Sequence, residues 1–75
     1  MISDPYILLV YTSSHAIGIE RKLHTMGIPC KLSSIPRGVS SDCGICVRFE
    51  EKDLEAVQAM VKTLTFEIQA IIPHS

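Results

Sequence analysis

Two cysteines separated by two residues are the most distinctive chemical feature of this sequence. Cys43-Gly44-Ile45-Cys46 is a C-x-x-C motif, a spacing found in redox-active dithiols and in metal sites. A thiol reacts or binds metal as its thiolate, which nearby cations and unpaired N–H groups stabilise. Cys43 lies in a polar stretch, whereas Cys46 begins an apolar one. Cys43 is therefore the candidate for an accessible, reactive thiol, and Cys46 is a candidate second thiol.

The C-x-x-C motif could instead bind a metal ion or form a disulfide. Zinc takes about four ligands, and His15, Cys43 and Cys46 provide at most three, so we predict no metal site. A reversible disulfide between Cys43 and Cys46 stays open as an alternative. It is disfavoured because extended backbone points the two side chains apart.

Periodicity and breakers predict the elements that position these cysteines. Alternating or continuous apolar runs predict strands at about residues 6–12, 30–35, 45–49 and 66–72. Helical spacing of apolar residues predicts one helix from about Ser14 to Met26, ended by Gly27, and another across 54–64. The order βαββαβ is typical of a ferredoxin-like α+β fold, a two-layer sandwich with a four-stranded antiparallel sheet and two helices on one face. We expect one domain over residues 1–75, with a core of about 6–72.

This topology predicts where the functional site lies. The first and third strands become antiparallel central neighbours, so the start of the first helix faces the loop of residues 36–44. That loop has nine residues, more than a tight hairpin turn needs, which favours a binding role. We predict Cys43 and Arg37 as the reacting pair. The predicted binding residues around them are Ser13, Ser14, His15, Ser40, Ser41 and Gly44.

Composition limits the classes of partner. The apolar share of 47% and charged share of 20% predict a folded chain, and a net charge of -1 with scattered basic residues argues against nucleic acid. No apolar run approaches the ~20 residues that span a bilayer, and the opening residues lack a basic n-region. We therefore expect a cytoplasmic protein with reduced thiols and no membrane partner.

Several blocks of this sequence resemble one family. The blocks are Thr12-Ser13-Ser14-His15-Ala16, Gly27-Ile28-Pro29, Pro36-Arg37, Ser40-Ser41-Asp42-Cys43-Gly44 and Arg48-Phe49. Their order and spacing, from Tyr6 to Ile72, are similar to those of small bacterial domains of unknown function described as selenium/sulfur (Se/S) carrier-like proteins. The resemblance implies that Cys43 bears the sulfur or selenium, with Arg37 and Ser41 shaping its loop. Cys46 is a departure, since that family commonly has a small apolar residue there.

The resemblance and the residues together give a first hypothesis and two rivals. The first is a carrier, rather than a turnover enzyme, that holds a persulfide or selenide equivalent on Cys43 and passes it from donor to acceptor proteins without a cofactor. The second is a non-catalytic dimeric interaction module or small-anion sensor. Strand residues Ile7 and Leu9 alternate with Leu8 and Val10, so both faces of the first strand are apolar and a homodimer would cover one of them. The third is a thiol-disulfide redox protein that uses Cys43 and Cys46.

Overall fold

Two helices and four strands make up the described part of the chain. The computed structural model describes residues 5–39 and 43–73. Its elements are β1 (Pro5–Leu9), α1 (Ser13–Thr25), β2 (Cys30–Ser34), β3 (Ile45–Glu50), the 3-10 turn η1 (Glu51–Asp53), α2 (Leu54–Val61) and β4 (Ala70–Pro73). Neither helix of these residues is long and apolar enough to cross a membrane. The element order matches the predicted βαββαβ pattern.

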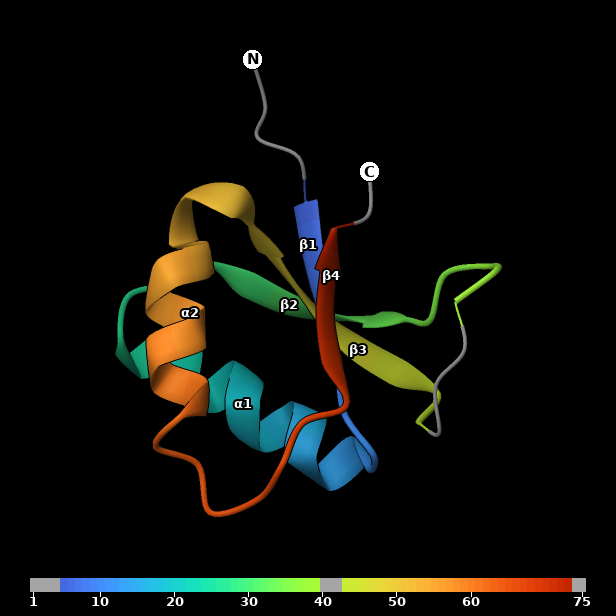
Figure 1. The fold of residues 1–75 in the computed structure, drawn as a ribbon, viewed down its shortest axis with the longest axis horizontal. Helices are drawn as coiled ribbons and strands as arrows, with labels where there is room; N and C mark the ends of the chain where they lie inside the picture. The colour runs from blue at the N-terminus through green and yellow to red at the C-terminus, as the bar shows by residue number, and fades with distance from the viewer. Residues whose placement is uncertain (1–4, 40–42, 74–75) are drawn as a thin grey trace.

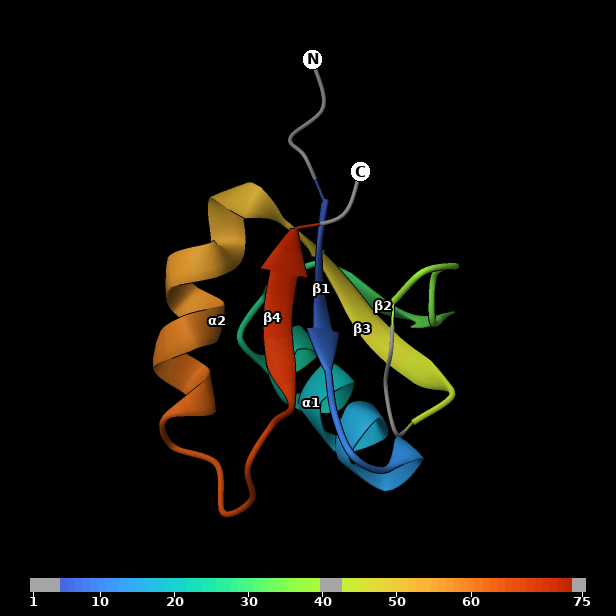
Figure 2. The same ribbon diagram turned by 45° about the vertical axis from the view of Figure 1, so that its right-hand side comes forward.

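The strands form one antiparallel sheet in the order β2-β3-β1-β4 (Figure 1). β1 lies between β3 and β4, with Leu9 opposite Cys46 on one side and Ala70 on the other. Both helices cover the same face of this sheet, as the turned view in Figure 2 also shows. The predicted ferredoxin-like α+β fold is confirmed.

Local signals fix both ends of α1. At the start, the Thr12 hydroxyl accepts a hydrogen bond from the His15 backbone N–H at 3.2 Å, which satisfies one of the unpaired donors of the first turn. At the end, Gly27 has a φ of 77°, and the N–H groups of Gly27 and Ile28 donate to the carbonyls of His24 and Leu23. This is a Schellman motif, which glycine permits because it has no Cβ.

The second helix and the last strand are both shorter than predicted. α2 ends at Val61 rather than near Leu64. Just after this end, the Thr63 hydroxyl donates a hydrogen bond to the Met60 carbonyl at 2.7 Å. β4 begins at Ala70 rather than Phe66. The Phe66 ring instead stacks on His15 of α1, so a contact across the fold overrides the local alternation.

The sheet buries apolar residues on both faces. On the helix side, the main core contains Leu8, Val47 and Phe49 from the sheet with residues of both helices. On the other side, which we call the open face, Ile7 is 0% exposed and Leu9 3%. Complete burial of such a side chain contributes roughly 1.5–3 kcal/mol.

The cover of the open face comes from the same chain. Ile35 and Val39, from the segment that follows β2, and Ala70 and Ile72 of β4 pack against the buried side chains of this face. In Figure 1 the segment after β2 extends beyond the sheet on the side away from α2. The apolar open face of β1 therefore does not require a second subunit for its burial, although it was the reason for expecting a homodimer.

Candidate functional site

Cys43 lies at the junction between the β2–β3 loop and the first residue of β3. It was predicted as an accessible loop residue, but the structure buries it, with 7% of its surface exposed. It belongs to the main core cluster together with Val10, the residue that follows β1, and Ala16 in α1. The prediction that Cys43 is exposed is wrong, because Cys43 faces the main core although its sequence neighbours are polar. The predicted proximity of this loop to the start of α1 agrees with the shared cluster.

Cys46 occupies the other side of the sheet. It is 0% exposed and forms the small open-face cluster with Ile7 and Leu9. Its Sγ donates a weak hydrogen bond to the Ser34 carbonyl of the neighbouring strand at 3.8 Å. Cys46 is thus a packed strand residue, as its place in an apolar run indicated.

The two cysteines of the motif therefore belong to cores on opposite faces of one sheet. A disulfide needs the two Cβ atoms about 3.5–4.5 Å apart and directed toward each other. All three cysteines, including Cys30, are thiols in this structure. The geometry disfavours the redox alternative for the same reason as the sequence did.

Burial controls the acidity of two of the thiols. It raises the pKa of Cys46 above its ordinary value, while the guanidinium of Arg48 lowers it and Cys43 raises it. Burial also raises the pKa of Cys30, and the carboxylate of Glu20 adds to this effect. The Cys30 Sγ donates to the Glu20 carbonyl at 3.6 Å. Cys30 and Cys46 are therefore poor thiolate nucleophiles at neutral pH.

Arg37 lies at the tip of a tight turn within the β2–β3 loop. The Val39 N–H donates to the Pro36 carbonyl at 3.2 Å, and Gly38 has a φ of 86°, which suits the third position of a type II turn. The Arg37 side chain is exposed. No hydrogen bond or ion pair joins its guanidinium to another residue that the structure describes. The turn leaves this cation available to an incoming group.

The base of the loop is closed by the backbone. The Ile35 N–H donates to the Gly44 carbonyl at 3.4 Å, so Gly44 contributes a structural bond at the point where the two strands separate. Two further predicted loop residues, Ser40 and Ser41, lie outside the described residues.

The first turn of α1 holds the remaining predicted residues. Ser13 and Ser14 are exposed. His15 is half-buried, and its ring stacks on Phe66 with the centroids 3.8 Å apart and the planes at 8°. The His15 Nδ1 is buried and makes no hydrogen bond. Phe66 was missed because its alternation with Ile68 is typical of a strand, and no local signal indicates a ring stack.

The residues described include no group of three or more His, Cys, Asp or Glu side chains that could hold a metal ion. The described residues form three features: the buried Cys43 thiol, the start of α1 capped by Thr12, and the stacked rings of His15 and Phe66. These features define the class of the protein, a small ferredoxin-like α+β domain with a buried cysteine at a loop-to-strand junction.

Residues 5–73 match the model of the family described as "Putative Se/S carrier protein-like", and the chain belongs to this family. The resemblance found in the sequence is thereby confirmed. No curated protein and no solved structure matches the chain.

Proposed function

We propose that this protein carries sulfur or selenium on Cys43 and passes it from a donor protein to an acceptor protein in the cytoplasm. The proposal rests first on the family, whose description names Se/S carriers. The observation that supports Cys43 in this role is the state of the other two thiols. Burial raises the pKa of both Cys30 and Cys46, and both lie within strands, which leaves Cys43 as the candidate nucleophile.

The transfer step is a thiolate exchange. The Cys43 thiolate attacks the terminal sulfur of a donor persulfide, R–S–SH. A new S–S bond forms at Cys43, the S–S bond of the donor breaks, and the donor cysteine leaves as its thiolate. The acceptor takes the terminal sulfur in the same way and restores the Cys43 thiolate. With R–S–SeH as donor, selenium takes the place of the terminal sulfur, and no oxidant or reductant is consumed.

The burial of Cys43 fits a carrier. A persulfide exposed to solvent is open to attack by other thiols, whereas a side chain that is 7% exposed is shielded from them. The turn at residues 36–39 brings a cation into the segment that leads to Cys43. We infer that Arg37 meets the anionic chalcogen of the donor or acceptor.

The proposal is tested by loading the protein with glutathione persulfide and measuring intact mass and peptide mass. We expect one added sulfur atom on Cys43, no label in Cys43→Ser, and full labelling in the matched controls Cys30→Ala and Cys46→Ala. A second reaction with a thiol acceptor should then remove the added sulfur. Full labelling and transfer by Cys43→Ser would contradict the proposal.

A further inference from the structure

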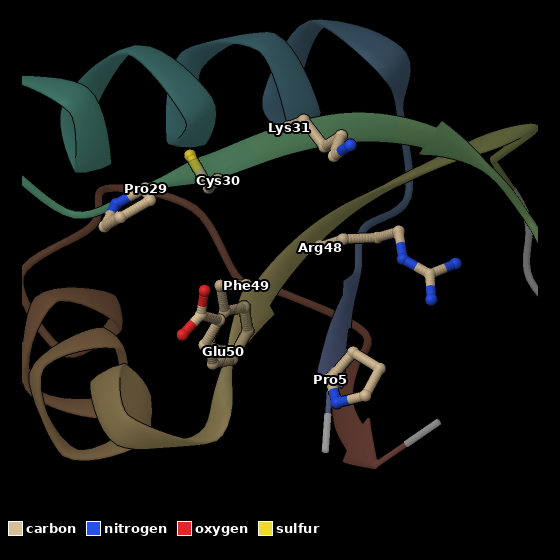
Figure 3. Close-up of a pocket in the computed structure, with 7 residues that line it drawn as sticks. All are labelled: Pro5, Pro29, Cys30, Lys31, Arg48, Phe49 and Glu50. Atoms are coloured by element: carbon tan, nitrogen blue, oxygen red, sulfur yellow. The ribbon is translucent and has the colours of Figure 1, made fainter. Parts of the chain in front are cut away.

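A cavity lies at the opposite end of β3 from Cys43. Its volume is about 260 Å³, and Figure 3 shows its lining. The lining residues are Pro5, Pro29, Cys30, Lys31, Arg48, Phe49 and Glu50. Because β3 runs from Ile45 to Glu50, the strand rise of about 3.3 Å per residue separates this cavity from the Cys43 junction by roughly 15 Å. The cavity is therefore a different site from the one proposed for sulfur transfer.

Two cations face each other across adjacent strands in this cavity. Lys31 of β2 is directly opposite Arg48 of β3 in the antiparallel register, so their side chains leave the same face of the sheet. Figure 3 shows both side chains extending to the same side of β3, with Pro5 below them and the Cys30 thiol on the other side. Like charges at directly opposed positions destabilise a sheet.

No carboxylate among the described residues forms an ion pair with Lys31 or Arg48. The ion pair found in residues 5–39 and 43–73 joins Lys52 Nζ to Glu50 Oε1 at 3.8 Å. Glu50 lines the same cavity, but its charge is shared with Lys52. The side chains that line the cavity therefore carry a net positive charge. An anion bound between Lys31 and Arg48 would turn their repulsion into attraction.

The shape and lining of the cavity select the class of anion. Arg presents a planar fork that binds a carboxylate or phosphate through two hydrogen bonds, and Lys adds a point charge. Pro5 supplies apolar surface on the same side as these donors. We propose that this cavity binds a small organic anion, with its carboxylate or phosphate between Lys31 and Arg48 and its apolar part against Pro5.

The test is a titration of the full chain followed by amide chemical shifts, with phenyl phosphate and phenylacetate as separate probes. We expect saturable shifts centred on Lys31, Arg48 and Phe49. Sodium chloride at matched ionic strength should not reproduce them. Saturation with one probe alone identifies the preferred head group, phosphate or carboxylate. Shifts that follow ionic strength for both probes would overturn the proposal.

Variants locate the binding. Lys31→Met and Arg48→Met keep the apolar stem of each side chain, and each should weaken binding by roughly tenfold or more, since a hydrogen bond to a charged group is lost. Arg21→Met, which removes an exposed cation of α1, is the matched control and should bind as the unmodified protein does. Cys43→Ser should also bind normally, because the site is independent of sulfur transfer. Unchanged affinity in both cavity variants would refute the assignment.

Thermal unfolding gives a second readout that does not depend on the choice of probe. At low salt, Lys31→Met removes a like-charge contact and should raise the melting temperature relative to Arg21→Met. A melting temperature no higher than that of Arg21→Met would show that the cation pair is not under repulsion, which contradicts the basis of the proposal.

Discussion

Cys43 and Cys46 belong to cores on opposite faces of the same sheet, although only two residues separate them. Their chemistry is therefore separate. Cys43 shares a core with both helices, whereas Cys46 is held among the apolar residues of the open face. A C-x-x-C motif acts as a dithiol at the start of a helix, where both sulfurs turn to the same side. At the start of a strand, the same spacing places the two sulfurs on opposite faces of the sheet.

We predict that mild oxidation of the native protein forms no disulfide between Cys43 and Cys46. The measurement is peptide mass mapping after treatment with diamide and blocking of remaining thiols. In denaturant the same treatment should link the two cysteines, which controls for their reactivity. A linked pair in the native protein would mean that the junction before β3 rearranges more easily than the structure indicates.

Buried thiols make the protein less stable in alkali. Because the folded-state pKa of Cys46 is raised, its contribution to stability is complete below the ordinary thiol pKa of about 8.5 and is lost as pH rises through the raised value. We expect the free energy of unfolding to fall as pH rises above about 8.5.

Urea unfolding at several pH values measures this loss. Cys46→Ala lowers stability at neutral pH by leaving a small cavity, but its decline with rising pH should be shallower than that of the unmodified protein. An identical decline in both would assign the alkaline loss to other groups. Cys30→Ala should also make the decline of stability with rising pH shallower, since burial raises the pKa of Cys30 as well.

The hydroxyl of Thr12 holds the start of α1. We expect Thr12→Ala to lower the free energy of unfolding by about 1 kcal/mol, because the His15 N–H loses its acceptor. Thr12→Ser retains the hydroxyl and serves as the control. Equal stability of the alanine and serine variants in urea unfolding would contradict a capping role.

The His15–Phe66 stack connects α1 to the segment before β4. A double-mutant cycle with His15→Ala and Phe66→Ala should give a coupling of roughly 0.5–1.5 kcal/mol, the range for aromatic pairs. Unfolding in urea gives the four free energies that the cycle requires. Additive effects of the two substitutions would show that the close approach of the rings does not stabilise the fold.

The sequence predicts the fold because its local signals agree with one another. The predicted helix from about Ser14 to Met26 agrees with α1, Ser13–Thr25, within one residue at each end, and the apolar runs give all four strands. Errors occur where a long-range contact overrides a local pattern. Phe66 leaves the predicted strand because its ring stacks on His15, and no local signal encodes that partner.

The candidate site was harder to predict than the fold. Residue types around Cys43 are polar, so the sequence indicates exposure, yet the chain turns Cys43 into the main core. The opposition of Lys31 and Arg48 was also missed, since neither residue is unusual alone. It follows from the register of β2 and β3, which becomes known only when both strands are placed in the sheet.

The position of β1 also affects how the chain folds. Its hydrogen-bonded neighbours, β3 and β4, both come from the second half of the sequence, so the central strand of the sheet is the first to be synthesised and has no adjacent partner nearby in the chain. Contacts between residues so far apart in the sequence cost loop-closure entropy before they form, and this cost slows folding. Until β3 arrives, a strand that is apolar on both sides is exposed to association with other chains. We therefore expect β1, which is buried once folding is complete, to be the segment most prone to association before β3 pairs with it.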